Sequence, residues 1–330
     1  MRNSFFDVLK FLAIMLVVYG HVAGAFGCHF GQPWLDNFIV GMNMPLFFVV
    51  SGYFAAKTIE GGDWRKLGRR VYGYFWPLAV VSVIFAALAV SCHITGSEKG
   101  FIGYAGRWFL FPPWFLWCLA ICFSLTFLCM RLHRPILRWG LFLLLIIVLP
   151  CLKGVWYMSD VRAMLPHFVF GVFVLRKWEV RRDWRVGLPC LLVYLLGVVF
   201  QGNIHDNGLG FYGQDTTWFA FVKDPALVLQ YGARVANGII GSVGIMWILQ
   251  FVMDRFDAMK RLAPFGTTTL GIYILHQWIL ARIAEAKCYS GSVVVVLFWS
   301  GIIFLFCHYL TWWTKKIRIL RRWMWGVFDA

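Results

Sequence analysis

The sequence predicts an all-α protein, a polytopic transmembrane helical bundle of about ten spans whose N- and C-termini are both cytoplasmic. Composition gives the first indication: 61% of the 330 residues are hydrophobic and only 14% are charged, where soluble domains average about 25% charged. Several apolar runs approach the roughly 20 residues that cross a bilayer as a helix. The basic residues, in addition, gather in every second connecting segment.

The apolar runs set the limits of the expected spans. They cover residues 6–26, 35–56, 71–91, 113–130, 136–150, 163–176, 187–201, 233–253, 267–286 and 292–313. The fifth, sixth and seventh runs are short for a bilayer, and interrupted or tilted helices would explain them. We expect residues 1–330 to form a single integral-membrane domain.

The positive charge indicates orientation. With the N-terminus in the cytoplasm, most of the 31 Lys and Arg residues fall in inner segments, chiefly 57–70, 176–185 and 315–322, as the positive-inside rule requires. The net charge of +16 is therefore interpreted as a topology signal. We expect the lipid bilayer as a partner and no nucleic acid.

The nine cysteines show neither a CxxC pair nor the spacing of a zinc site. We expect no metal and no permanently bound cofactor. Cys28, Cys92, Cys151 and Cys288 fall in or near outer loops, and a disulfide among them stays open because nothing selects a pair. The first apolar run lacks a clear cleavage site, so we expect it to remain as the first span.

That first run carries three polar residues, Asp7, Lys10 and His21, although ionisable groups inside a span are costly. On a helix, Lys10 and His21 lie about 20° apart and Asp7 within about 60° of both, so all three face the protein interior. His21 lies about 16 Å beyond Lys10 along the axis. The alternative to a functional polar stripe is purely structural. Asp7 and Lys10 would then form an i,i+3 ion pair near the cytoplasmic surface, and His21 would be a hydrogen-bonded interior histidine.

Two connecting segments carry further candidates. The inner loop before the third span contains Lys66, Arg69 and Arg70; it is either a topology signal or an anion site for a phosphate-bearing substrate. The outer loop 202–232 is long and rich in Gly, Asp and aromatic residues. Its Trp218 would stack on a sugar if the loop binds substrate; otherwise the loop caps the bundle.

Five motifs occur in one order along the chain. They are MRNSFFDVLKFLAIMLVVYGH at the start, MPLFFVVSGYF (Met44–Phe54), the basic loop followed by Pro77, PPWFLWCLA (Pro112–Ala120) and GTTTLGIYILH (Gly266–His276). In this order they resemble membrane acyltransferase family 3, the bacterial integral-membrane O-acyltransferases. Lys10, His21 and Asp7 occupy that family's first-span positions. The family often has two arginines separated by two residues in the inner loop, where this chain has Lys66 and Arg69.

The resemblance implies transfer of an acyl group, usually acetyl from acetyl-CoA, to a hydroxyl of a carbohydrate or another cell-envelope acceptor. It also implies a multi-pass protein of the bacterial cytoplasmic (inner) membrane. Coenzyme A carries phosphates, so we expect acyl-CoA as the donor, with Lys66, Arg69 and Arg70 facing its nucleotide and Lys10 guiding it or pairing with Asp7.

His21 is the expected general base, taking the proton of the acceptor hydroxyl, or it is itself acylated first. Asp7, about 21 Å away along the helix, cannot orient it, so its partner must come from another span. Candidates for that partner are Asn43, Ser51, Arg162, Arg234 and Asn237. Candidates for substrate binding are Ser51, Tyr273, His276 and Trp218, and for His276 a structural role is the alternative.

A competing interpretation is a transporter or flippase for a small anionic or sugar substrate, because charge inside a multi-span bundle fits that class equally well. Transporters often carry an internal repeat between halves, and the first-half motifs do not recur here. A non-enzymatic scaffold would not need the polar stripe of the first span. The ordered motifs therefore favour the acyltransferase.

Overall fold

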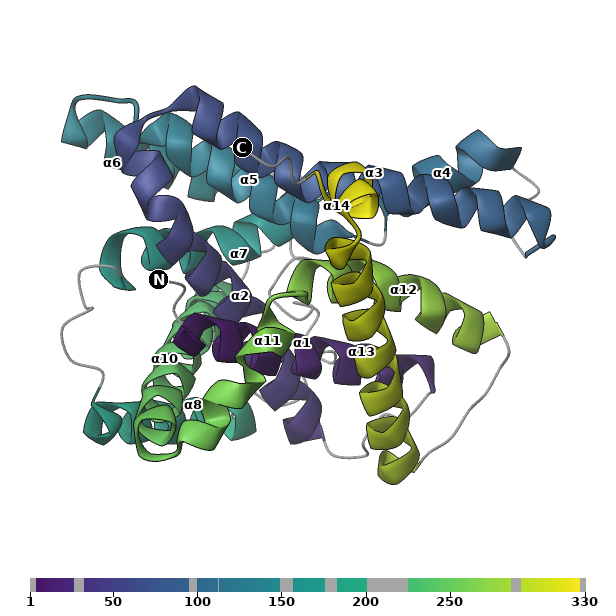
Figure 1. The fold of residues 1–330 in the computed structure, drawn as a ribbon. Coiled ribbons are helices and arrows are strands. Elements are labelled where there is room, and N and C mark those ends of the chain that lie inside the picture. Colours follow the sequence, from purple (N-terminus) through teal and green to yellow (C-terminus); the bar gives the residue numbers. More distant parts are fainter. Residues whose placement is uncertain are drawn as a thin grey trace. The chain divides into compact units, whose positions relative to one another are not determined.

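A computed structural model describes residues 4–26, 33–94, 100–111, 113–148, 157–175, 183–200, 225–285 and 292–326 (Figure 1). Throughout these residues the secondary structure is helical, without a strand, which confirms the all-α class. The helices are α1 (Ser4–Ala25), α2 (Pro33–Gly61), α3 (Trp64–Ser91), α4 (Gly100–Leu110), α5 (Trp114–Cys129), α6 (Pro135–Val148), α7 (Met158–Phe170), the π-helix η3 (Gly171–Leu175), α8 (Trp184–Phe200), α10 (Pro225–Arg255), the 3-10 helix η4 (Asp257–Leu262), α11 (Ala263–Gly266), α12 (Thr269–Glu285), α13 (Val293–Lys316) and α14 (Arg318–Trp325).

Each apolar run that the sequence predicted as a span falls on one of these helices. The boundaries differ by a few residues; α2, for example, continues to Gly61 and α3 begins at Trp64. Within the described residues four helices were not predicted: α4, the short η4 and α11, and α14. Glycines interrupt the hydrophobic pattern of α4, and α14 is too short and too basic to be recognised as a span.

Four helices in the described part of the chain are long and apolar enough to cross a membrane: α1, α3, α10 from Ala226, and α13. The pair α4 and α5, bent by 58°, would count as a fifth span. The helices α6 and α8 are apolar but shorter. Membrane-spanning helices are thus supported, whereas the number of about ten spans and the location of the termini stay predictions.

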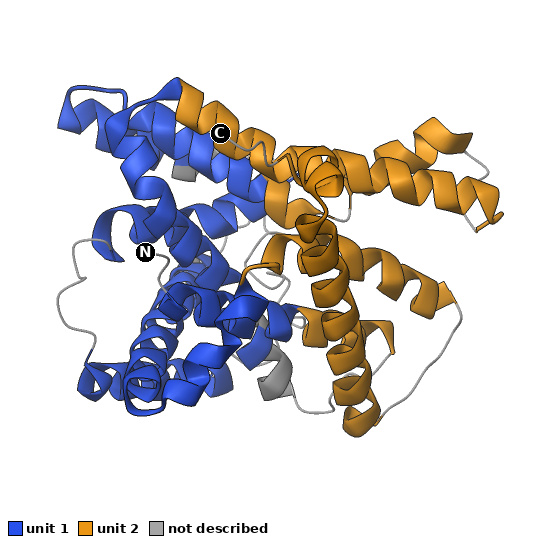
Figure 2. Ribbon diagram, in the orientation of Figure 1, with its two compact units in different colours: residues 1–17, 30–64, 118–266 blue, residues 18–29, 65–117, 267–330 orange. Residues whose placement is uncertain are grey.

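The chain packs as two compact units (Figure 2). Unit 1 comprises residues 1–17, 30–64 and 118–266, and unit 2 comprises residues 18–29, 65–117 and 267–330. The expectation of one domain over 1–330 stays a prediction.

In unit 1, α2 packs against α7, η3 and α10, and α10 packs against α8. Two glycines lie where α2 crosses α7 and η3, and we refer to this contact as the α2–α7 crossing. A Cβ atom on Gly52 would overlap the backbone oxygen of Phe168, and one on Gly171 would overlap that of Val49. Small residues at such crossings let helix backbones approach in membranes. The crossing therefore depends on glycine at both positions.

In unit 2, α12 packs against α13, and α13 against α14. The later half of α3 joins this group through Phe85, whose ring stacks on Trp278 of α12 with 4.9 Å between centroids and meets Trp108 of α4 edge-on at 6.1 Å. The short helix α14 is held by Trp325, whose Nε1 donates to Thr314 Oγ1 at 3.1 Å. The helices α3, α4 and α12 thus meet around an aromatic cluster.

Candidate functional site

Two histidines from opposite ends of the chain meet in unit 2. His21 lies on the last part of α1 and His276 on α12, and His21 Nδ1 is 2.9 Å from His276 Nε2. The two ring centroids lie 5.2 Å apart and the ring planes differ by 12°, as expected for an in-line hydrogen bond between nearly coplanar rings. His276 is fully buried, whereas His21 is partly exposed. His276 therefore contacts His21 on the side of the His21 ring that faces the protein interior.

One arrangement of protons satisfies this pair. His276 Nδ1 lies 2.8 Å from the backbone oxygen of Ile272, one helical turn earlier; a carbonyl only accepts, so Nδ1 carries the proton. In a neutral imidazole the other nitrogen is then an acceptor, and burial favours the neutral form. His21 Nδ1–H consequently donates to His276 Nε2. The lone pair of His21 is left on Nε2.

Gln277 gives His21 a second neighbour. Its carboxamide nitrogen Nε2 lies 3.1 Å from His21 Nδ1, and a 180° turn of this group exchanges its nitrogen and oxygen. With its oxygen towards Nδ1, it accepts the same proton that His276 accepts. Two consecutive residues of α12 thus fix the orientation of the His21 ring.

His21 lines a pocket of about 530 Å³. The pocket belongs to unit 2 and is formed by the end of α1, by α4 and by the end of α12. Besides His21, its polar and aromatic lining residues are Tyr104, Arg107, Trp108, Phe111, Gln277, Arg282 and Glu285. Within the described residues both hydrogen bonds of His21 fall on Nδ1. The Nε2 lone pair therefore stays available to a ligand in this pocket.

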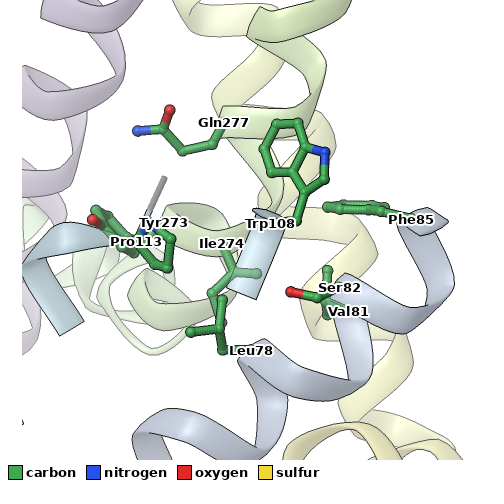
Figure 3. Close-up of a pocket in the computed structure, with 9 residues that line it drawn as sticks. All are labelled: Leu78, Val81, Ser82, Phe85, Trp108, Pro113, Tyr273, Ile274 and Gln277. Carbon is green, nitrogen blue, oxygen red and sulfur yellow. The ribbon is translucent and has the colours of Figure 1, made fainter. Parts of the chain in front are cut away.

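A second, much smaller pocket of about 10 Å³ lies next to the first and shares Trp108 and Gln277 with it. Figure 3 shows its wall: mostly apolar side chains of α3, α4 and α12 together with Pro113, and Ser82, Tyr273 and Gln277 as polar groups. That volume accommodates about one water molecule, which is similar in size to a methyl group. The site thus combines a large compartment with a small, mostly apolar one.

The structure places two predicted substrate-binding residues near this histidine pair. Tyr273 lines the small pocket, its ring centroid lies 5.8 Å from that of His276, and its hydroxyl accepts the backbone N–H of Phe115 at 3.3 Å. His276 was expected to line the cavity of His21. It contacts His21 directly instead and has no exposed surface.

Asp7 and Lys10 form the ion pair that the i,i+3 spacing predicted, with 2.7 Å between Lys10 Nζ and Asp7 Oδ1. Asp7 is buried, with 4% of its surface exposed. In unit 1 a Cβ atom on Gly266 would overlap the backbone oxygen of Asp7. The helix turn that carries Asp7 therefore packs tightly against α11, and a catalytic role for Asp7 or Lys10 stays a prediction.

The basic candidates Lys66, Arg69 and Arg70 lie in the first two turns of α3, within unit 2. Their spacing of three and four residues brings them to one side of the helix. Lys66 and Arg69 are exposed and Arg70 is half-buried. An anionic group at the start of α3 can therefore reach these side chains.

The structure describes one of the two remaining predicted site residues. Ser51 lies on α2 in unit 1, and Trp218 lies outside the described residues. Of the outer-loop cysteines, Cys92 is exposed and free, and Cys28, Cys151 and Cys288 lie outside the described residues. In the described ranges no three His, Cys, Asp or Glu side chains form a group that could hold a metal ion.

Two of the residues considered as partners for His21 have contacts of their own in unit 1. Asn237 Nδ2 donates to the backbone oxygen of Tyr194 at 3.3 Å, and the Arg162 guanidinium lies 5.8 Å from the Tyr231 ring centroid. The orienting partners that the structure shows are His276 and Gln277. Sequence reasoning missed Gln277, although it directly follows His276, and the pocket residues of α4, because α4 was assigned to a loop.

The comparisons with known proteins support the family that the order of the motifs indicated. The family model described as an acyltransferase domain, acyltransferase family 3, matches residues 3–313. The nodulation protein NolL of Sinorhizobium fredii (strain NBRC 101917 / NGR234) is 31% identical over 284 residues, which cover 83% of this chain and 77% of NolL. No solved structure matches the chain. The chain belongs to acyltransferase family 3 and is an acyltransferase with membrane helices.

Proposed function

We propose that this protein is an integral-membrane O-acyltransferase with His21 as its general base. It moves an acetyl group from cytoplasmic acetyl-CoA to a hydroxyl of a carbohydrate or another cell-envelope acceptor. The observation that carries this proposal is the His21–His276 pair, which leaves an Nε2 lone pair on the wall of a 530 Å³ pocket in a chain of an acyltransferase family.

The reaction needs no group beyond the donor, the acceptor and the imidazole. His21 Nε2 takes the proton of the acceptor hydroxyl as the oxygen attacks the thioester carbonyl carbon. A new C–O bond forms, the C–S bond breaks, and the leaving thiolate of coenzyme A takes the proton from the imidazolium. His276 holds the ring through Nδ1 during both transfers, and it accepts a stronger hydrogen bond while His21 is charged. Gln277 accepts from the same nitrogen once its carboxamide oxygen is turned towards Nδ1.

The same lone pair also permits an acyl-enzyme. In that route His21 Nε2 attacks the thioester first and passes the acyl group to the acceptor in a second step. The two routes differ in one observable, because only an acyl-enzyme releases one equivalent of CoA per protein in the absence of acceptor. Rapid mixing with acyl-CoA alone separates them.

A topology of about ten spans with both termini in the cytoplasm determines which side of the membrane the site faces. Under that topology α3 and α12 both run from the inner to the outer side, so Ser91 and Glu285 end on the outer side of the bacterial inner membrane. His21 lies in the outer half of α1 by the same reasoning. The large pocket, formed by α4 and the ends of α1 and α12, is then accessible to an acceptor from outside.

The donor enters from the other side. The coenzyme A phosphates bind Lys66, Arg69 and Arg70 at the start of α3, since guanidinium groups match phosphate geometry. Arg70 and Ser82 lie about 18 Å apart along the helix at 1.5 Å per residue, a distance that the long arm of coenzyme A spans. The acetyl methyl group occupies the small pocket of about 10 Å³. Asp7 holds Lys10, which guides the nucleotide at the cytoplasmic end of α1.

The test is acyl transfer by the purified protein in nanodiscs, supplied with radiolabelled acetyl-CoA and a cell-envelope extract. CoA must be separated from acetyl-CoA by chromatography, because the exposed Cys92 thiol would react with a thiol reagent. We expect CoA release that depends on the extract and label that appears in an extract component. If wild-type protein releases no CoA with any extract, a transporter or flippase becomes the better interpretation.

A further inference from the structure

The large pocket has an uneven charge. Two arginines and one carboxylate line it. Arg282 Nη1 forms an ion pair with Glu285 Oε2 at 2.6 Å, and its guanidinium lies 5.7 Å from the Trp278 ring centroid. Among the described residues Arg107 has no such partner, and it is exposed. One positive charge of the pocket is therefore uncompensated.

We propose that the acceptor is a hydroxyl compound that carries its own negative charge, a saccharide with a carboxylate or phosphate group, and that Arg107 binds this group. The inference rests on the proposed function, since it assigns the pocket beside His21 to the acceptor. A guanidinium binds carboxylate and phosphate through two parallel hydrogen bonds. Arg107 therefore both selects the acceptor and turns one of its hydroxyls towards His21.

A buried hydroxyl in the same wall is a second indication of a ligand. Tyr104 is 2% exposed, and within the described residues its hydroxyl has no hydrogen-bond partner. A buried polar group without a partner loses the hydrogen bonds that it makes to water in the unfolded chain, and this destabilises the protein. A saccharide hydroxyl that pairs with Tyr104 removes this cost, because it supplies both a donor and an acceptor.

The size and the walls of the pocket also fit a saccharide. Small-molecule sites typically measure about 300–1,000 Å³, and this half-open pocket measures about 530 Å³. Trp108 and Phe111 add aromatic surfaces next to Arg107. Such rings cover the apolar face of a sugar, while Arg107 and Tyr104 take its polar substituents.

Coenzyme A is the other anion that this reaction brings to the protein, and the geometry places its phosphates elsewhere. Along α3, Arg69 lies about 24 Å from Phe85 at 1.5 Å per residue, and Phe85 contacts Trp108, which lines the pocket. The basic residues at the start of α3 and Arg107 are therefore far apart within unit 2. If the thioester lies between the basic residues of α3 and Arg107, the large pocket stays available to the acceptor.

The experiment measures binding without any donor, so that it does not depend on turnover. Equilibrium dialysis of radiolabelled methyl β-D-glucuronide is compared with methyl β-D-glucoside, and methyl α-D-mannoside 6-phosphate with methyl α-D-mannoside. The protein is held in phosphatidylcholine nanodiscs, because maltoside detergents carry sugar headgroups that would compete. The variants are Arg107→Gln, Arg107→Lys and Tyr104→Phe, with Arg185→Gln as the control. Arg185 is an exposed arginine of α8 in unit 1.

We expect at least one anionic probe to bind wild-type protein about tenfold more tightly than its neutral counterpart, the effect of one charge-assisted contact. Which pair shows the difference tells carboxylate from phosphate. Arg107→Gln should abolish the preference for the anionic probe, and Arg107→Lys should keep part of it. Tyr104→Phe should weaken the binding of both members of a pair equally. Arg185→Gln should behave as wild type.

Equal affinity of wild-type protein for both members of each pair would overturn the inference, as would the absence of binding by every probe. Binding of the anionic probes that survives Arg107→Gln, or that coenzyme A displaces in direct competition, would assign the charge to another site. The proposed function fails separately, through the lack of CoA release. Loss of the anion preference together with normal CoA release removes only the present inference.

Discussion

His21 Nδ1 lies 2.9 Å from His276 Nε2, although the two histidines are 255 residues apart in the sequence. The backbone oxygen of Ile272 fixes the proton on His276 Nδ1, so the hydrogen bond between the two histidines runs from His21 Nδ1–H to His276 Nε2. The lone pair of His21 is thereby left on Nε2, at the wall of the pocket. A histidine with this tautomer accepts a proton from a bound hydroxyl without rearrangement.

The first prediction concerns His276 as a positioning residue. His276→Phe removes the acceptor for His21 Nδ1, whereas His276→Gln can place a carboxamide oxygen near the position of Nε2. We expect His276→Phe to lower kcat by roughly 10–100-fold, as outer partners of functional groups commonly do, with KM for acetyl-CoA unchanged. His276→Gln should recover most of the loss. The measurement is steady-state CoA release at varied acetyl-CoA.

A merely structural role of His276 would give a different pattern. Because the side chain is fully buried, both variants would then lower the melting temperature and the amount of active protein without a selective effect on kcat. Equal kcat for His276→Phe and wild type, at equal amounts of folded protein, would contradict the assignment.

The second prediction concerns the donor site on α3. Arg69→Gln combined with Arg70→Gln should raise KM for acetyl-CoA by about tenfold and leave kcat unchanged, since these residues bind phosphates and not the reacting atoms. The KM of wild-type protein should itself rise with salt, because the exposed Arg69 is screened. Arg185→Gln is the control. An unchanged KM in the double variant would leave these arginines as topology signals.

The third prediction concerns the length of the acyl chain. The small pocket holds about 10 Å³, so wild-type protein should use acetyl-CoA and discriminate strongly against butyryl-CoA. Val81→Ala or Phe85→Ala enlarges the pocket and should raise activity with butyryl-CoA relative to acetyl-CoA. Leu88→Ala, at an exposed position of α3, is the control. If wild-type protein transfers both chains equally, this pocket does not bind the acyl group.

The fourth prediction concerns the crossing of α2 and α7. Gly52→Ala or Gly171→Ala places a Cβ atom against backbone of the facing helix, and overpacking of this kind typically costs about 1–3 kcal/mol. We expect each substitution to lower the melting temperature in nanodiscs by several degrees. Gly68→Ala, inside α3, meets nothing within 4 Å and should leave the melting temperature unchanged or raise it slightly, because alanine favours a helix over glycine. Equal melting temperatures for all three variants would mean that the crossing tolerates side chains.

The sequence predicted the elements that depend on local pattern. Long apolar runs identified α1, α3, α10 and α13 as membrane-spanning helices, and the i,i+3 spacing identified the ion pair of Asp7 with Lys10. Both follow from helix periodicity, which is visible in one segment at a time. The order of the motifs likewise led to the family.

The sequence could not predict which segments meet in space. The contact of His21 with His276 and Gln277 joins the first helix to α12, and no local pattern pairs residues so far apart. The pocket residues Tyr104 and Arg107 were missed because α4 is short and glycine-rich. The sequence left open whether His276 lines the cavity or has a structural role for a related reason: side-chain direction depends on how α12 packs.

The central claim is that His21 Nε2 accepts the proton of the acceptor hydroxyl. The most direct test compares extract-dependent CoA release by wild-type protein, His21→Ala and the control His133→Ala, which changes an exposed histidine of unit 1. Loss of general-base catalysis should lower kcat of His21→Ala by about 10²–10⁴-fold, while its melting temperature and acetyl-CoA binding stay close to those of wild type. Full CoA release by folded His21→Ala would contradict the account.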